Sequence, residues 1–93
     1  MQKMIIASLA AFLVTGTATA APAPKPKVSM KHARAMALKL APGRIKSSEY
    51  EKEGGVWRYS FDIQQQGHIQ EIGIDAMTGK VVENSNEGKV DHD

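Results

Sequence analysis

Few side chains in this 93-residue chain are of a type that could act in catalysis. Nucleophilic catalysis needs a serine or cysteine beside a base and an orienting acid, and the chain contains no cysteine. Ser47 and Ser48 are separated by long stretches of sequence from His32, His68 and His92. The sequence therefore predicts no catalytic residue and indicates a protein that is not an enzyme.

The carboxylates offer acid–base or metal chemistry as the next alternative. Glu49, Glu51 and Glu53 alternate along one predicted strand, which points them to solvent, whereas acid–base catalysis needs burial to separate two pKa values. Residues 91–93 (Asp-His-Asp) offer oxygen and imidazole donors but no preformed geometry. We therefore predict no metal site and no cofactor, and keep a cation- or metal-responsive envelope protein as the alternative function.

Two aromatic residues are the candidates for binding a partner. Trp57 lies beside the Gly54-Gly55 turn, where a large side chain is incompletely covered, and tryptophan is favoured at interface hot spots. It also shares a strand face with Tyr59, so membership of the core is the favoured interpretation. Tyr50 is the large side chain of the preceding strand. An open meander also leaves unpaired strand edges that can accept an extended partner segment.

The first twenty residues have the three regions of a signal peptide. Lys3 is followed by an apolar run over residues 4–14 and by the small-residue sequence Ala18-Thr19-Ala20, so we predict cleavage after Ala20. The apolar run is about half the ~20 residues that cross a bilayer, and no cysteine is present for a lipid anchor. We expect an exported protein, periplasmic or secreted, without stable membrane insertion after cleavage.

Cleavage would leave a single small domain with an asymmetric charge. Residues 21–27 (Ala-Pro-Ala-Pro-Lys-Pro-Lys) form a proline-rich leader that we expect to be extended and mobile. Residues 21–46 carry seven basic side chains and no acidic one, whereas residues 47–93 carry four basic and ten acidic ones. No aromatic residue interleaves the basic run, so nucleic acid is not an expected partner.

One amphipathic helix is predicted after the leader. Ser29 is a favourable N-cap, and Pro42-Gly43 ends the helix. Apolar residues recur with helical spacing on one face, which we expect to be buried. These residues are Ala33, Met36, Ala37 and Leu40.

Four strands are predicted beyond Gly43, over residues 45–52, 56–64, 69–75 and 80–83, joined by glycine-containing turns. Ile69 is out of phase with the apolar residues that follow it, which predicts either a bulge or a late strand start near Gln70. We expect residues 84–93 to be a polar, disordered tail. The clearest strand has Trp57, Tyr59, Phe61 and Ile63 on one face and Arg58, Ser60 and Asp62 on the other. The fold class is α+β, with one N-terminal helix packed on an antiparallel meander of about four strands.

Three segments resemble the PepSY domain family, found in propeptides of secreted metalloproteases and as isolated exported proteins. They are the helix at residues 33–43, the strand pair at residues 49–63 and the closing segment at residues 71–81. The sequence Asp-Ala-Met-Thr-Gly-Lys-Val at residues 75–81 is the most specific part. The first strand departs from the family pattern, because Lys46 and Ser48 occupy usually apolar positions. Either that strand is a thinly packed edge, or Ile45 makes the contact.

The resemblance implies a domain over residues 28–83 that binds or restrains a peptidase, or regulates another exported protein. It carries over no catalytic residue, and we expect Asp75, Thr78 and Gly79 to build a turn. The expected partner is a protein, such as a peptidase or an envelope sensor. Trp57 and Tyr50 are the candidate residues for that contact.

Overall fold

The computed structural model describes residues 22–89. Helix α1 (Met30–Leu40) is followed by four strands: β1 (Arg44–Glu53), β2 (Val56–Gln64), β3 (His68–Asp75) and β4 (Val81–Lys89). The predicted signal peptide and the Asp-His-Asp sequence at residues 91–93 lie outside the described residues.

Helix α1 begins as its sequence predicts. The Ser29 side chain accepts a hydrogen bond from the amide of His32 at 3.0 Å, which satisfies one of the free amides of the first turn. The helix ends at Leu40, and Ala41 leaves helical geometry with φ −140°. No helix among residues 22–89 is long and apolar enough to cross a membrane.

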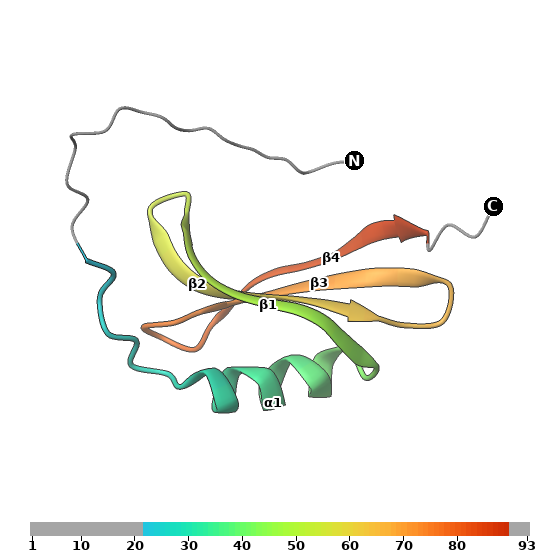
Figure 1. Cartoon of the computed structure of the whole chain (residues 1–93), viewed down its shortest axis with the longest axis horizontal. Coiled ribbons are helices and arrows are strands. Elements are labelled where there is room, and N and C mark those ends of the chain that lie inside the picture. Colours follow the sequence, from blue (N-terminus) through green and yellow to red (C-terminus); the bar gives the residue numbers. More distant parts are fainter. Residues whose placement is uncertain (1–21, 90–93) are drawn as a thin grey trace.

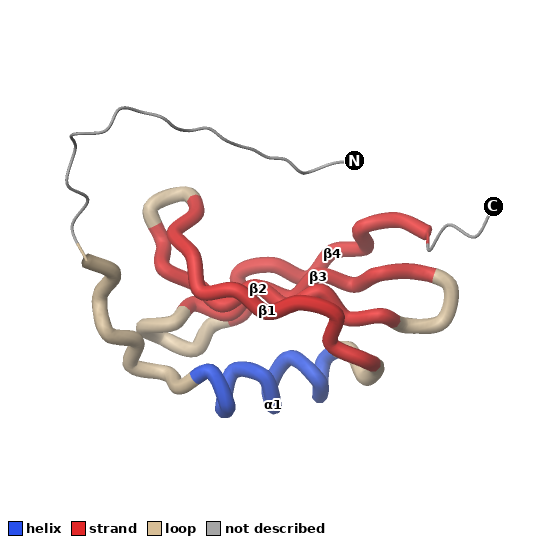
Figure 2. The backbone as a smooth tube through the Cα atoms, in the orientation of Figure 1, coloured by secondary structure: helices blue, strands red, loops and turns tan. Residues whose placement is uncertain are grey.

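The four strands form one antiparallel sheet in the order β1-β2-β3-β4. Helix α1 lies across one face of this sheet, and no helix formed by residues 22–89 lies on the opposite face (Figures 1 and 2). Gly54 and Gly55 join β1 to β2 with φ values of 61° and 80°, as a two-residue hairpin turn with two left-handed positions requires. The predicted α+β architecture of one helix on a four-stranded meander is confirmed.

The core lies between α1 and the two central strands. Ala33 and Ala37 are fully buried, and their small side chains let the helix approach the sheet closely. Large apolar side chains of β2 and β3 fill the remaining space. The buried set consists of Ala33, Ala37, Ala41, Tyr59, Phe61, Ile63, Ile72, Ile74 and Ala76.

The prediction that Leu40 belongs to the buried face is wrong. Its side chain is 47% exposed, whereas Ala41 is 2% exposed. The helix stops at Leu40, so the chain turns and brings the next residue, Ala41, toward the sheet. Helical spacing therefore does not predict the burial of Leu40, the last residue of the helix.

The last strand is longer than predicted. β4 continues to Lys89, and Asn84, Ser85 and Asn86 pair with Ile72, Glu71 and Gln70 of β3. The expectation that the chain is disordered from Asn84 onward is therefore wrong for residues 84–89. Polar side chains do not exclude a strand at a sheet edge, because the backbone supplies the pairing.

Three register shifts interrupt the strand pairing of the sheet. The β1–β2 pairing shifts between Ile45 and Ser47, so that Ile45 and Tyr50 both pack against the core although β1 is an edge strand. The β3–β4 pairing shifts between His68 and Gln70, which agrees with the predicted bulge, whereas the alternative of a late strand start is wrong because β3 begins at His68. A third shift lies between Gly73 and Ile74. Both expectations for the first strand are therefore met, because β1 is an edge strand and Ile45 also contacts the core.

The turn between β3 and β4 has the expected chemistry. Asp75 Oδ1 accepts hydrogen bonds from the amides of Met77 at 2.8 Å and Thr78 at 3.1 Å. Gly79 has φ 82° and donates its amide to the Asp75 carbonyl at 2.8 Å. Thr78 Oγ1 accepts from the Lys80 amide at 3.2 Å. These residues are turn builders, as their types indicate.

Candidate functional site

An aromatic cluster lies at the end of the sheet beside the β1–β2 hairpin. We use this name for Tyr50, Trp57 and Tyr59. The ring centroids of Tyr50 and Trp57 are 5.0 Å apart, and those of Tyr50 and Tyr59 are 5.3 Å apart, both within the range of attractive aromatic pairs. The structure thus brings together the two residues predicted to bind a partner.

The strand register explains this cluster. Tyr50 of β1 is directly opposite Tyr59 of β2, and Trp57 lies two residues before Tyr59 on the same face. Phe61 continues the row toward α1, with its ring centroid 6.3 Å from that of Tyr59. Tyr59 and Phe61 are buried, whereas Tyr50 and Trp57 are half-buried. Trp57 therefore does not belong to the fully buried core that was its favoured interpretation.

The segment before α1 contacts the aromatic cluster. The Tyr50 hydroxyl donates a hydrogen bond to the Pro24 carbonyl at 2.6 Å, and the Tyr59 hydroxyl donates one to the Val28 carbonyl at 2.7 Å. Burial, and then the neighbouring Tyr50, raises the pKa of Tyr59, so its hydroxyl stays a donor at neutral pH. The proline-rich leader thus contacts the sheet through the Pro24 carbonyl.

Ala76 connects this segment to two parts of the sheet. Its carbonyl accepts from the amides of Lys27 at 3.0 Å and Val28 at 2.9 Å, and its own amide donates to the Trp57 carbonyl at 2.9 Å. Ala76 is fully buried. The chain between the leader and α1 is therefore fixed to the β3–β4 turn and to β2.

A network of charged and polar side chains lies on the sheet face opposite α1. We call this face of the sheet the polar face. Its centre is Arg58, which is 6% exposed although no helix in the described part of the chain covers it. The guanidinium lies over Gly73 of β3, where a Cβ atom would be 2.6 Å from Arg58 Cζ. The absence of a side chain at Gly73 gives the arginine its place against the sheet.

Carboxylates from three strands surround Arg58. Its Nη2 atom is 2.5 Å from Glu83 Oε1 of β4 and 3.7 Å from Glu71 Oε2 of β3, and its Nη1 atom is 3.6 Å from Glu53 Oε1 of β1. Arg58 Nε also donates to Ser60 Oγ at 3.0 Å. A buried cation requires such compensation, so the arginine and the carboxylates stabilise one another's charges.

Ser60 extends the network to the first strand. It is 7% exposed, and its hydroxyl donates to Glu51 Oε2 at 2.6 Å. The prediction that Glu49, Glu51 and Glu53 form only a solvated acidic face is therefore incomplete. Glu49 and Glu53 are exposed, but Glu51 is half-buried and bonded to Ser60.

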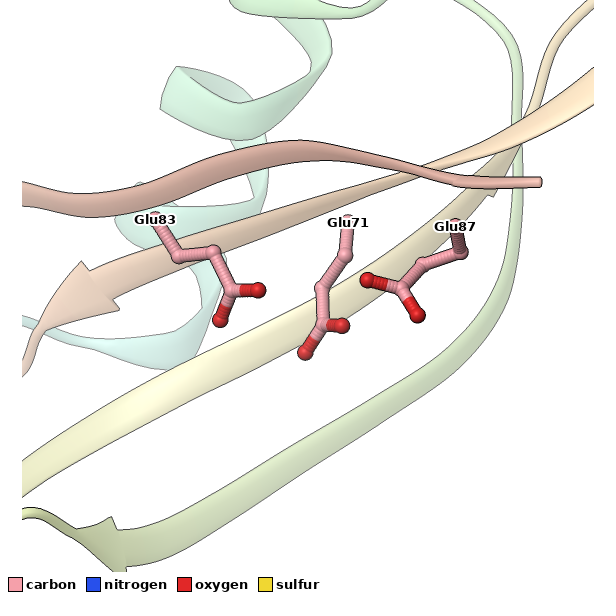
Figure 3. A group of neighbouring side chains, drawn as sticks. All are labelled: Glu71, Glu83 and Glu87. Atoms are coloured by element: carbon pink, nitrogen blue, oxygen red, sulfur yellow. The ribbon is translucent and has the colours of Figure 1, made fainter. Parts of the chain in front are cut away.

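Three glutamates form a carboxylate cluster at the β3–β4 side of this face. Figure 3 shows the side chains of Glu71, Glu83 and Glu87 directed toward one another, and one oxygen from each lies within 4.8 Å of the others. Burial raises the pKa of Glu71 to about 8, and a hydrogen bond with Glu87 and the charges of Glu83, Glu87 and Asp62 add to the increase. Glu71 therefore takes up a proton at a higher pH than an ordinary glutamate. Oxygen donors of this kind suit hard cations such as Ca²⁺, but Arg58 already neutralises Glu83.

A comparison with protein families identifies the domain. The family model for the peptidase propeptide and YPEB domain, PepSY, matches residues 27–84, more than half of the chain. The chain belongs to the PepSY family. No curated protein and no solved structure gives a significant match.

The PepSY match covers the aromatic cluster and the surroundings of Arg58, but not Glu87 of the carboxylate cluster. It includes the helix, the aromatic cluster, Arg58 and the closing turn, and it ends at residue 84, inside β4. The family description associates this domain with propeptides of peptidases, which indicates a propeptide-like or inhibitor-like module. The resemblance seen in the sequence is thus confirmed, and its extent of residues 28–83 is close to that of the match.

Arg58 is the structural residue that sequence reasoning missed. The alternating pattern correctly placed it on the face opposite Trp57 and Tyr59, but that face was taken to be solvated. One signal was available in the sequence. Arg58 is the only basic residue of β2, which pairs with the glutamate-rich strand β1, and β3 contains a single glycine.

Proposed function

We propose that this PepSY domain is an exported, non-catalytic binding module that restrains a peptidase or modulates another envelope protein. The observation that carries this proposal is the half-buried aromatic pair of Tyr50 and Trp57 on the helix-bearing face of the sheet. Aromatic side chains that are partly exposed and held rigid by neighbours provide contact area at small entropic cost, which is typical of protein interfaces.

The edge position of β1 supports the same function. Within the described residues β1 pairs only with β2, so one side of its backbone is available to an extended segment of a partner. Addition of such a segment would place it beside Tyr50, which lies on that strand. The backbone would supply affinity and the aromatic pair would supply selectivity. A segment of a peptidase bound in this way is withheld from its own function.

The test is a measurement of peptidase activity in the extracytoplasmic fraction of the producing cells, with and without the purified chain. We expect the chain to lower the activity and the variant Trp57→Ala to lower it at least about tenfold less effectively, because a hot-spot truncation costs 2 kcal/mol or more. Lys46→Ala is the matched control, since Lys46 is exposed on the same edge strand β1 but away from the aromatic pair.

Two results would contradict the proposal. One is an unchanged activity at every concentration of the chain together with the failure of any envelope protein to bind it in a direct assay. The other is equal potency of Trp57→Ala and Lys46→Ala, which would place the contact elsewhere.

The cation-responsive alternative is decided by calorimetric titration with zinc, copper and calcium. Its support is the carboxylate cluster of Glu71, Glu83 and Glu87. The glutamates are already engaged, because Glu83 pairs with Arg58 and Glu71 shares a hydrogen bond with Glu87. We therefore expect no heat of specific binding at this cluster. Saturable binding that Glu71→Gln abolishes would replace our proposal with this alternative.

A further inference from the structure

The proline-rich leader contacts Tyr50, one of the two residues that we assign to partner binding. Residues 22–27 read Pro-Ala-Pro-Lys-Pro-Lys, with proline at every second position up to Pro26. In Figure 1 this segment runs from the start of α1 toward the β1–β2 hairpin, where the aromatic cluster lies. Its direct contact is the 2.6 Å hydrogen bond from the Tyr50 hydroxyl to the Pro24 carbonyl.

The chemistry of this contact is that of proline-rich recognition. Proline lacks an amide hydrogen and has a fixed φ, so a proline-rich segment is extended before it binds and loses little entropy. Its carbonyls remain free acceptors, and the surfaces that bind it combine aromatic rings with side-chain donors. Tyr50 supplies a ring and a donor at one place, and Trp57 supplies a second ring 5.0 Å away.

The contacts differ between the two ends of the leader. Lys27 and Val28 are held by backbone hydrogen bonds to Ala76, and the Val28 carbonyl accepts from Tyr59. The Pro24 carbonyl is held by the Tyr50 hydroxyl, and Pro22 and Pro24 are exposed. Residues 22–26 can therefore leave the aromatic cluster while the hydrogen bonds at Lys27 and Val28 stay in place.

We propose that Tyr50 and Trp57 of the aromatic cluster form a binding site for extended proline-rich segments, which the chain's own residues 22–26 occupy in cis. This inference rests on the proposed function and adds the chemistry of the segment that a partner presents. A proline-rich segment of a partner binds after the leader is displaced. Because a tethered segment competes at an effective concentration in the millimolar range, the leader lowers the apparent affinity for the partner and acts as a built-in competitor.

The test uses the fluorescence of Trp57, which is the single tryptophan of the chain. The full chain as isolated is compared with the triple variant Pro22→Gly, Pro24→Gly, Pro26→Gly, which keeps the hydrogen bonds at Ala76 but loses the extended leader. Both are titrated with the synthetic peptide Ala-Pro-Ala-Pro-Lys-Pro-Lys, which has the sequence of residues 21–27. We expect a saturable change in emission, with at least about tenfold tighter binding to the triple variant than to the unsubstituted chain.

Two controls separate proline recognition from other causes. The peptide Ala-Ala-Ala-Ala-Lys-Ala-Lys has the same charge without proline, and we expect no saturable response to it. The variant Tyr50→Phe, made in the triple variant, removes only the hydroxyl that bonds Pro24, and we expect about threefold to tenfold weaker binding of the proline peptide. Thermal unfolding monitored by circular dichroism verifies that each variant is folded.

Two results would overturn the inference. One is the absence of a saturable response of the folded triple variant at millimolar peptide, and the other is an equal response to both peptides, which would indicate attraction by charge alone. Neither result touches the proposed function, because the peptidase assay measures partner binding independently. Inhibition of a peptidase without binding of the proline peptide would leave the open edge of β1 as the contact.

Discussion

The guanidinium of Arg58 lies against Gly73 of the neighbouring strand, on the sheet face opposite the helix. A Cβ atom at position 73 would be 2.6 Å from Arg58 Cζ, closer than atoms of this type approach in proteins. The arginine in turn pairs with Glu83 and Glu71. One glycine thus determines whether a cation can lie among the carboxylates of three strands, and this relationship leads to the first prediction.

Gly73→Ala is expected to lower the free energy of unfolding by about 1–3 kcal/mol, because the added methyl group displaces Arg58 from its carboxylates. Urea denaturation measures the change. In an Arg58→Ala background the same substitution should cost much less, since the guanidinium is gone. An equal cost in both backgrounds would show that the contact with Arg58 is not the cause.

Glu71 makes stability fall as the pH rises. Its pKa is raised to about 8 in the folded chain, from an ordinary value of 4.5. The proton-linked stabilisation is therefore complete below about pH 4.5 and is lost as the pH rises through about 8, where Glu71 becomes charged beside Glu83, Glu87 and Asp62. Arg58 moderates this repulsion without removing it.

Glu71→Gln is the corresponding test. We expect the variant to melt at a higher temperature than the unsubstituted chain at pH 9 and at a similar temperature at pH 4, because glutamine resembles the protonated carboxyl. Differential scanning calorimetry across this range measures the difference. A melting temperature of the variant that stays below that of the unsubstituted chain at pH 9 would contradict the assignment of a proton to Glu71.

Asp75 is expected to have the opposite pH dependence. The hydrogen bond from the Met77 amide, with that from Thr78, lowers the pKa of Asp75. Its contribution to stability is present above the ordinary value of 3.8 and is lost as the pH falls through the lower value in the folded chain. Asp75→Ala should cost about 1 kcal/mol at neutral pH in urea denaturation. Asp75→Asn, which keeps an acceptor oxygen, should cost clearly less; an equal cost would argue against these two bonds.

The close approach of α1 to the sheet depends on its alanines. Ala37→Leu should lower the free energy of unfolding by about 1–3 kcal/mol, because Ala37 is fully buried and no space exists for three more carbon atoms. Ala35→Leu is the matched control, since Ala35 is exposed on the same helix and should change stability by less than about 0.5 kcal/mol. Similar losses of stability at both positions would mean that helix propensity, and not packing against the sheet, causes the effect.

The sequence was sufficient for the elements and insufficient for their ends. Ser29, the alternating apolar residues of β2 and the Asp75 turn each act through local chemistry, so their types alone predict the structure. Leu40 was misplaced because the helix ends at that residue and not one turn later. The length of β4 was missed because its pairing with β3 is made by backbone atoms, which polar side chains do not reveal.

The candidate site likewise has parts that local sequence predicts and parts that only long-range contacts determine. Tyr50 and Trp57 were identified because large aromatic residues near a turn are conspicuous, and register then placed them in contact. The burial of Arg58 depends on groups from four strands and on a glycine 15 positions away, so no local pattern shows it. The contact of the leader with Tyr50 depends on the bend of the chain at Lys27 and Val28 and on their hydrogen bonds to Ala76, which residue types alone do not reveal.

The backbone hydrogen bonds at Ala76 also limit how much of the leader must move when a ligand displaces it. The carbonyl of this buried residue accepts hydrogen bonds from Lys27 and Val28, so only residues 22–26 of the leader can move away from the sheet. Their detachment requires neither melting of α1 nor opening of the sheet, and such short segments rearrange within nanoseconds to microseconds. A competing ligand would thus reach the rings of Tyr50 and Trp57 without any unfolding of the domain.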